Sequence, residues 1–213
     1  MTRGRLILIE GLDRTGKTTQ SNILLDKLKP NATLIKFPDR STEIGQLIDK
    51  YLTDRSFVLP DQAVHLLFSA NRWEVAQSIR ELLLAGKHVV LDRYVYSGIA
   101  YSAAKGVAGM DRNWCLQPDK GLLKPDLTIF LTNANVCENQ SRQGFGDERY
   151  EVSEFQQEVK KQFYKVFEDL EKKQNTLKLL NVAGKSIEQV ANEIWDVVQP
   201  KVAGEGHDAF LYF

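Results

Sequence analysis

The feature that most constrains this chain is the segment GLDRTGKT at positions 11–18, which has the spacing GxxxxGK(S/T). It comes directly after an apolar run at 6–10 and directly before a stretch of helical composition. In a strand–loop–helix context, this spacing lets backbone N–H groups and a helix N-terminus surround phosphate oxygens. The alternative, a glycine-rich turn with a solvated lysine, does not require that context. The segment therefore predicts an α/β protein with a nucleotide site.

Lys17 and Thr18 of this loop fit nucleotide binding, and Asp13 and Arg14 go beyond what simple nucleotide binding needs. Lys17 is expected to reach the β- and γ-phosphates, and the Thr18 hydroxyl is expected to bind Mg²⁺. A cation near a transferring phosphoryl group stabilises its charge, which makes Arg14 a candidate for a built-in arginine finger. A surface ion pair between Asp13 and Arg14 is the alternative, and spacing alone leaves both interpretations open.

The rest of the sequence alternates strand-like apolar runs with helical stretches, as in a parallel sheet covered on both faces. No linker or repeat interrupts the 213 residues, so we expect a single domain. Residues 203–213 differ in character and predict either a loose tail or an apolar clip on the domain surface. The further expected strands are 33–37, 88–91, 127–131 and 177–181, and the expected helices are 16–28, 42–52, 60–85, 94–105, 134–142, 151–173 and 186–198.

Composition sets limits on partners and location. Lys+Arg and Asp+Glu are equal at 28 each, so no global charge attracts the chain to nucleic acid or to a membrane. Cys115 and Cys137 are expected to be reduced packing thiols, although a disulfide between them stays open. The apolar run at 6–9 is too short for a signal peptide or a membrane helix. We therefore expect a cytoplasmic protein, with a nuclear or organellar pool as an alternative.

A second charged group follows the apolar strand at 88–91, where Asp92 and Arg93 are adjacent. Ligands of open α/β sheets bind beyond the carboxyl ends of strands, so both side chains are expected to face the same crevice as the loop 11–18. Asp92 would hold Mg²⁺ or its water shell, and Arg93 would bridge two phosphates. The alternative is that Asp92 is only the N-cap of the next helix.

Arg72 lies on the apolar stripe of the predicted helix 60–85, between Phe68 and Val75. An inward-facing arginine needs an acceptor, because a buried unpaired charge is costly. A heteroaromatic base would supply one, with Phe68 against its face and Arg72 at its edge. A snorkelling arginine, or one paired with Glu43 or Asp92, is the alternative.

Two further basic segments stand near the expected crevice. Residues 142–151 carry two glycines between Arg142 and Arg149 and predict a short lid that closes on phosphates and excludes water. A solvated helix–helix loop is the alternative. Arg40 follows the second expected strand and is expected at the crevice edge, unless Pro38 and Asp39 form only a surface turn.

Taken together, five separated motifs resemble the signatures of the thymidylate kinase family in their order and spacing. The resemblance is closest to the eukaryotic-type members and spans residues 6–198. It implies a P-loop nucleoside monophosphate kinase fold: α/β, with a five-stranded parallel sheet flanked by helices and a short lid. It also implies the reaction ATP + dTMP ⇌ ADP + dTDP with Mg²⁺, and a homodimer. The motifs are at 11–18, 37–42, 65–73, 92–94 and 145–150.

The resemblance further implies a dTMP site and an ATP site. Phe68 would stack on thymine, Arg72 would bond its edge, and Asp13 would bond the 3′-hydroxyl. Tyr101 would lie near C2′ of the sugar, where an aromatic side chain disfavours a ribose 2′-hydroxyl. The dTMP site would comprise Asp13, Phe37, Arg40, Phe68, Arg72, Arg93, Tyr101, Tyr150 and Gln156. The ATP site would comprise Arg14, Thr15, Gly16, Lys17, Thr18, Thr19, Arg93, Arg142 and Lys185.

The same resemblance assigns the chemistry to four residues, Arg14, Lys17, Asp92 and Arg93, with Thr18 and Asp92 at the metal. Arg14 places the chain in the group whose extra catalytic arginine lies in the P-loop. An acceptor phosphate is already anionic, so direct in-line transfer needs no strong general base.

Two other functions remain open at this point. A deoxynucleoside kinase would phosphorylate thymidine rather than dTMP. A nucleotide-dependent binding switch would hydrolyse ATP without an acceptor.

Overall fold

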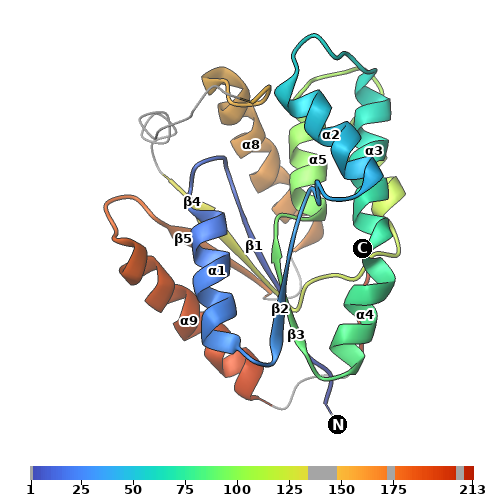
Figure 1. The fold of residues 1–213 in the computed structure, drawn as a ribbon. Helices are drawn as coiled ribbons and strands as arrows, with labels where there is room; N and C mark the ends of the chain where they lie inside the picture. The colour runs from blue at the N-terminus through green and yellow to red at the C-terminus, as the bar shows by residue number, and fades with distance from the viewer. Residues whose placement is uncertain (1, 134–147, 172–175, 205–208) are drawn as a thin grey trace.

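The computed structural model describes residues 2–133, 148–171, 176–204 and 209–213. Its centre is a five-stranded, wholly parallel sheet in the order β2-β3-β1-β4-β5 (Figure 1). This confirms the predicted sheet, and each strand begins and ends within one residue of its expected position. The strands are β1 Leu6–Gly11, β2 Ala32–Lys36, β3 His88–Asp92, β4 Leu127–Thr132 and β5 Leu177–Asn181.

The three central strands are buried on both faces, which explains their nearly continuous apolar sequences. Successive residues of β1 alternate between two cores, with Leu6 and Leu8 in one and Ile7 and Ile9 in the other. The register pairs Ile9 with Asp92. The glycine-rich loop after β1 and the charged turn after β3 therefore begin at the same edge of the sheet.

Helices cover both faces of this sheet (Figure 1). On one face α1 (Lys17–Leu28) and α9 (Ile187–Ala203) share a core with the odd-numbered side chains of β1. On the other face lie α4 (Ala76–Leu84), α5 (Val95–Ala103) and α8 (Ser153–Leu170). A third, smaller core joins α2 (Glu43–Thr53) to α3 (Asp61–Glu74) beside the carboxyl ends of the strands.

The predicted single helix at 60–85 is wrong. It is broken at Val75, whose φ of −110° and ψ of 2° end α3 and precede α4. The apolar stripe continues through Val75, so periodicity does not reveal the break. A β-branched residue such as Val75 is a weak helix former. It separates α3, which packs on α2, from α4, which packs on the sheet.

Other differences lie at helix ends and in the segment between α5 and β4. α6 (Arg112–Leu116) and the short 3-10 helix η1 (Gln117–Asp119) were not predicted. α9 continues to Ala203, beyond the expected end at 198, and α8 is shorter than 151–173 at both ends. The helix predicted at 134–142 lies outside the described residues. No described helix has the length and apolarity that crossing a membrane would require. Cys115 is a buried free thiol, as expected, and Cys137 lies outside the described residues.

The described part of the tail, residues 209–213, forms an apolar clip, so the expectation of a loose tail is wrong there. Tyr212 pairs with Leu123 in an antiparallel bridge. The guanidinium of Arg3 lies over the Phe210 ring at 4.7 Å and donates to the carbonyl of Ala209 at 3.0 Å. We call residues 209–213 the aromatic clip.

The packing of α9 yields a prediction about stability alone. Val198 is fully buried against the sheet. We expect Val198→Ala to lower the free energy of unfolding by about 1–3 kcal/mol, through lost burial and a residual cavity. Urea unfolding measures this change, with exposed Gln199→Ala as the control expected within about 0.5 kcal/mol of the parent. A loss no larger than the control's would contradict the packing of α9 described above.

Candidate active site

The loop after β1 is shaped by two glycines and folds around the carbonyl oxygen of Leu12. Gly11 and Gly16 have φ of 155° and 90°, and a Cβ on Gly11 would lie 2.6 Å from the carbonyl oxygen of Leu131. The Thr15 hydroxyl donates to the Leu12 carbonyl at 3.0 Å, and the Lys17 ammonium donates to the same oxygen. The predicted loop leads directly into α1, so the N-terminus of this helix lies beside it, as in a phosphate cradle.

Lys17 is the buried cation of this loop. Burial, together with the positive charge of Arg93, lowers the pKa of its ammonium to about 8, although Asp13, Asp92 and Glu10 act in the opposite direction. An anionic phosphate nearby would favour the charged form and reverse this shift.

Thr18 and Asp92 meet beside Lys17. The Thr18 hydroxyl donates to Oδ2 of Asp92 at 2.6 Å, which joins the start of α1 to the end of β3. A hydroxyl and a carboxylate are the hard oxygen ligands that Mg²⁺ takes when phosphates and water supply the rest. The described residues hold no cluster of three or more His, Cys, Asp or Glu that could bind a metal by itself. The pair therefore fits a magnesium ion held jointly with a nucleotide.

Asp92 is not the N-cap of α5, so that alternative is wrong. The cap position is Tyr94, and no side chain of its own or of Asp92 caps the helix. Glu10, from the end of β1, does this instead: its Oε1 accepts from the backbone N–H groups of Tyr94 and Ser97, both at 3.0 Å. Its Oε2 accepts from the Ser97 hydroxyl at 2.6 Å. The role of Glu10 was not predicted, although an acid inside an apolar strand is a usable signal.

Arg93 stands between the glycine-rich loop and α5 in a left-handed conformation, with φ of 67°. Its guanidinium donates to the Gly11 carbonyl at 3.2 Å and to the Ser97 hydroxyl at 3.1 Å, and it forms an ion pair with Asp13. Burial alone would lower the pKa of Arg93, but Tyr101 and nearby carboxylates raise it above its ordinary value. Burial would likewise raise the pKa of Asp13, but Arg93 and Lys17 lower it. Both groups are therefore charged at neutral pH.

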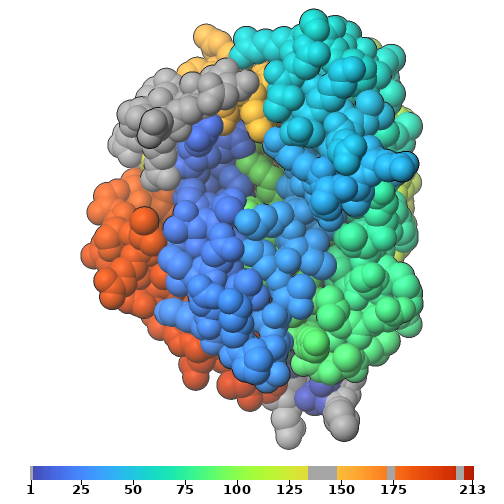
Figure 2. Space-filling view, in the orientation of Figure 1, coloured from blue at the N-terminus to red at the C-terminus, as the bar shows by residue number. Residues whose placement is uncertain are grey.

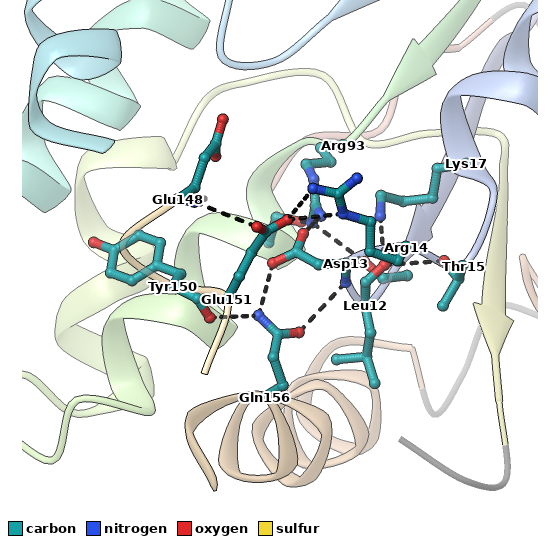
Figure 3. A network of polar contacts seen from close by, with 12 residues as sticks. Leu12, Asp13, Arg14, Thr15, Lys17, Arg93, Glu148, Tyr150, Glu151 and Gln156 are labelled. Carbon is teal, nitrogen blue, oxygen red and sulfur yellow. Dashed lines mark hydrogen bonds and ion pairs between the residues drawn. The ribbon is translucent and has the colours of Figure 1, made fainter. Parts of the chain in front are cut away.

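The predicted alternative of an Asp13–Arg14 surface pair is wrong. Asp13 pairs with Arg93, whereas Arg14 pairs with Glu151 at 2.9 Å (Figure 3). Arg14 also has a positive φ, 63°, a conformation that side chains other than glycine rarely adopt. Backbone strain of this kind recurs at functional sites.

A pocket adjoins these groups on the side of α3 and α5. The space-filling view shows this face of the molecule hollowed between α2 and the start of α1 (Figure 2). Aromatic rings and three arginines line the pocket. The lining includes these residues of the predicted dTMP site: Asp13, Phe37, Arg40, Phe68, Arg72, Arg93, Tyr101 and Tyr150.

Arg72 lines this pocket and is held by a carboxylate that sequence analysis missed. Its Nε and Nη2 donate to Asp119 at 3.0 and 2.6 Å, so neither Glu43 nor Asp92 is the partner. Both side chains are almost fully buried, 2% and 0% exposed. Asp119 also accepts from the Ser69 hydroxyl at 2.7 Å. A Cβ on Gly98 would lie 2.7 Å from Nη2 of Arg72, so any other residue there would displace this guanidinium.

The start of α8 is hydrogen-bonded both to Asp13 of the loop and to the end of the predicted lid (Figure 3). Gln156 donates to Oδ2 of Asp13 at 2.7 Å and to the Tyr150 carbonyl at 2.9 Å. The Tyr150 ring stacks on Phe155, with 5.3 Å between centroids. The remaining lid residues, including Arg142, lie outside the described part of the chain.

Two predicted basic residues of this region have protein partners. The Arg149 guanidinium donates to the carbonyls of Tyr51, Asp54 and Phe57 at 2.8–2.9 Å and ties the lid end to the end of α2. Arg40 is 40% exposed and pairs with Asp49 and Glu148 at 2.5 and 2.7 Å.

Two further residues of the predicted ATP site, Thr19 and Lys185, have these surroundings. Lys185 pairs with Glu193 at 2.7 Å in the turn between β5 and α9, and Thr19 is exposed on α1. Neither lines the pocket of Arg72.

The loop 11–18 borders the pocket lined by Arg72. A donor phosphate in the loop and an acceptor in the pocket would therefore meet where the two adjoin. This arrangement is typical of a P-loop kinase. Within that class, the family model described as thymidylate kinase matches residues 9–194. The chain belongs to the thymidylate kinase family.

Individual relatives agree with this assignment. The chain is 49% identical to the thymidylate kinase of Schizosaccharomyces pombe, over 92% of each chain. It is 46% identical to that of Homo sapiens, over 90% of this chain and 88% of that one. The solved structure of Candida albicans thymidylate kinase superposes with a TM-score of 0.91 at 47% identity, covering 100% of this chain and 99% of that one.

The lowered pKa of Lys17 predicts a pH-dependent nucleotide affinity. Bound phosphates favour protonated Lys17, so above pH of about 8 the protein must take up a proton to bind. We expect the affinity for ATP to fall as pH rises from 8 to 9.5, approaching roughly tenfold per pH unit. Calorimetric titration measures this slope.

Lys17→Arg is the matched control, since a guanidinium stays charged over this range. In Lys17→Arg, the fall of ATP affinity between pH 8 and 9.5 is expected to vanish. An equal slope in both proteins would contradict the role of Lys17.

Proposed function

We propose that the protein transfers the γ-phosphoryl group of ATP to dTMP, with the donor phosphates in the loop 11–18 and dTMP in the pocket of Arg72. The observation that carries this proposal is the Arg72–Asp119 pair. It fixes a buried guanidinium on the wall of a pocket that also holds Asp13 and Arg93, next to the phosphate loop. A switch that only hydrolysed ATP would have no use for such a pocket.

The base would be recognised by Arg72 and Phe68. The pair with Asp119 occupies Nε and Nη2, and Nη1 bonds to no residue in the described part of the chain. A donor held there favours a base with a carbonyl oxygen, as in thymine and uracil, over one with an amino group. Phe68 would cover the face of the base. The thymine methyl adds only about 1–3 kcal/mol of discrimination against dUMP.

The sugar and the acceptor phosphate would contact the charged groups between the pocket and the loop. Asp13 accepts from Gln156 and would accept from the 3′-hydroxyl, with Tyr101 beside the sugar. Arg93 and Arg40 would bind the acceptor phosphate. Arg40 would then exchange its exposed carboxylate partners for a phosphate, a more highly charged acceptor.

Transfer would depend on alignment and on neutralising charge. The dTMP phosphate is an anion, so no general base is required. Lys17 is a buried cation of the loop, and the partly buried Arg93 donates to the Gly11 carbonyl; both would stabilise the transferring group with little reorganisation. Thr18 and Asp92 would hold Mg²⁺, which supplies further positive charge at the donor phosphates. Arg14 would move from Glu151 to the transferring phosphoryl group.

We further propose a cytoplasmic homodimer that binds neither nucleic acid nor membrane. The resemblance to the family supports the dimer, and the balanced charge supports the lack of nucleic-acid and membrane binding. Sedimentation of the purified protein tests the dimer.

The acceptor is tested by incubating the protein with ATP, Mg²⁺ and one of dTMP, dUMP, dGMP, CMP or thymidine, and separating the products. The Candida albicans enzyme is described as having broad substrate specificity, so the panel includes a purine. We expect one dTDP per ADP with dTMP, less product with dUMP, and little with CMP. Turnover of thymidine but not dTMP would indicate a nucleoside kinase. ADP release at one rate with every acceptor would indicate a switch.

Removing the Arg14 guanidinium tests its proposed role. We expect Arg14→Ala to lower kcat by about 10²–10³-fold, because one charge-stabilising donor is lost in the transition state. KM for ATP and dTMP should change far less. Arg112→Ala is the control, since it loses only an exposed ion pair with Asp169. Unchanged kcat in Arg14→Ala would refute the assignment.

A further inference from the structure

We propose that the aromatic clip is a positioning element of the acceptor pocket, acting through Phe213. This inference rests on the proposed binding of dTMP in that pocket. The clip itself does not line the pocket, so its action must pass through residues that do.

The first route is a chain of aromatic rings. The Phe213 ring meets Tyr96 edge-on, with 5.2 Å between centroids and 74° between planes. It also contacts Tyr94, at 6.0 Å, and Tyr94 in turn contacts Phe37 at 5.5 Å. Tyr94 and Phe37 both line the pocket, and Tyr94 is 1% exposed. Phe213 therefore backs an aromatic wall of the acceptor pocket from outside.

The second route is a set of backbone hydrogen bonds to the segment that follows Asp119. The Lys124 N–H donates to the Leu211 carbonyl at 2.7 Å, and the Phe213 N–H donates to the Leu122 carbonyl at 3.1 Å. The Leu122 N–H donates to the carbonyl of Asp119 itself at 3.1 Å. The clip thus fixes the segment that presents Asp119 to Arg72.

Both routes end on the acceptor side. Among the described residues, the hydrogen bonds and ring contacts of the clip go to Arg3, Arg80, Tyr94, Tyr96 and the segment 121–124. None goes to the loop 11–18. Loosening the clip should therefore disturb dTMP binding and leave ATP binding nearly unchanged, which a general loss of stability would not do.

The test compares kinetics of full-length variants at a temperature where each is folded. We expect Phe213→Ala to raise KM for dTMP about five- to tenfold, while KM for ATP changes by less than roughly twofold. Phe213→Leu keeps apolar volume without a ring, and its KM for dTMP should lie between those of the parent and Phe213→Ala. If Phe213→Ala does not fold, a raised dTMP KM in Phe213→Leu decides the question.

Three controls separate the possible outcomes. Leu211→Ala removes an exposed side chain of the clip and should leave both KM values unchanged. Val198→Ala measures what lost stability does by itself. If the Phe213 variants lose stability but keep the parent KM for dTMP, the inference is overturned. Phe68→Ala probes the pocket directly: if it leaves KM for dTMP unchanged, the proposed dTMP site fails, and the inference fails with it.

Discussion

The carboxylate of Glu10 connects the two halves of the site. It lies at the end of the central strand, one residue before the phosphate loop, and it is fully buried. It accepts hydrogen bonds from two backbone N–H groups and one hydroxyl at the start of α5, the helix that carries Ser97 and Tyr101. Burial raises its pKa, while the nearby charge of Arg93 and these hydrogen bonds act in the opposite direction. The phosphate loop on the donor side and the start of α5 on the acceptor side are therefore both held by the Glu10 carboxylate.

Around this point the site is assembled from paired charges. Arg72 is paired with Asp119, Arg93 with Asp13 and Arg14 with Glu151. Such pairs contribute little net stability, because the cost of removing charges from water offsets their attraction. The pairs of Arg72 and Arg93 hold these two guanidinium groups in one orientation before any ligand binds, which is the preorganisation that charge-stabilising catalysis needs. The absence of a side chain at Gly98 leaves room for the guanidinium of Arg72.

Much of this architecture could be predicted from sequence because it is encoded locally. The strands are short apolar runs, and the phosphate loop has a spacing that few other structures require. Asp119 could not be found in this way: it lies in an unremarkable Gln-Pro-Asp turn, and only the tertiary fold brings it to Arg72. The partners of Arg149 could not be found for the same reason, since these carbonyls at the end of α2 are distant in sequence. The roles of all the predicted site residues toward ligands, Arg14, Lys185 and Gln156 among them, remain predictions.

The central claim, that Glu10 orders the acceptor side through hydrogen bonds, is tested most directly by kcat/KM for dTMP in two variants. Glu10→Gln keeps a carbonyl oxygen for the two N–H groups and an amide for the Ser97 hydroxyl. Glu10→Leu has similar volume but leaves these groups unsatisfied. The account predicts that kcat/KM for dTMP falls at least about tenfold in folded Glu10→Leu and much less in Glu10→Gln. A Glu10→Leu variant with the parent value would contradict it.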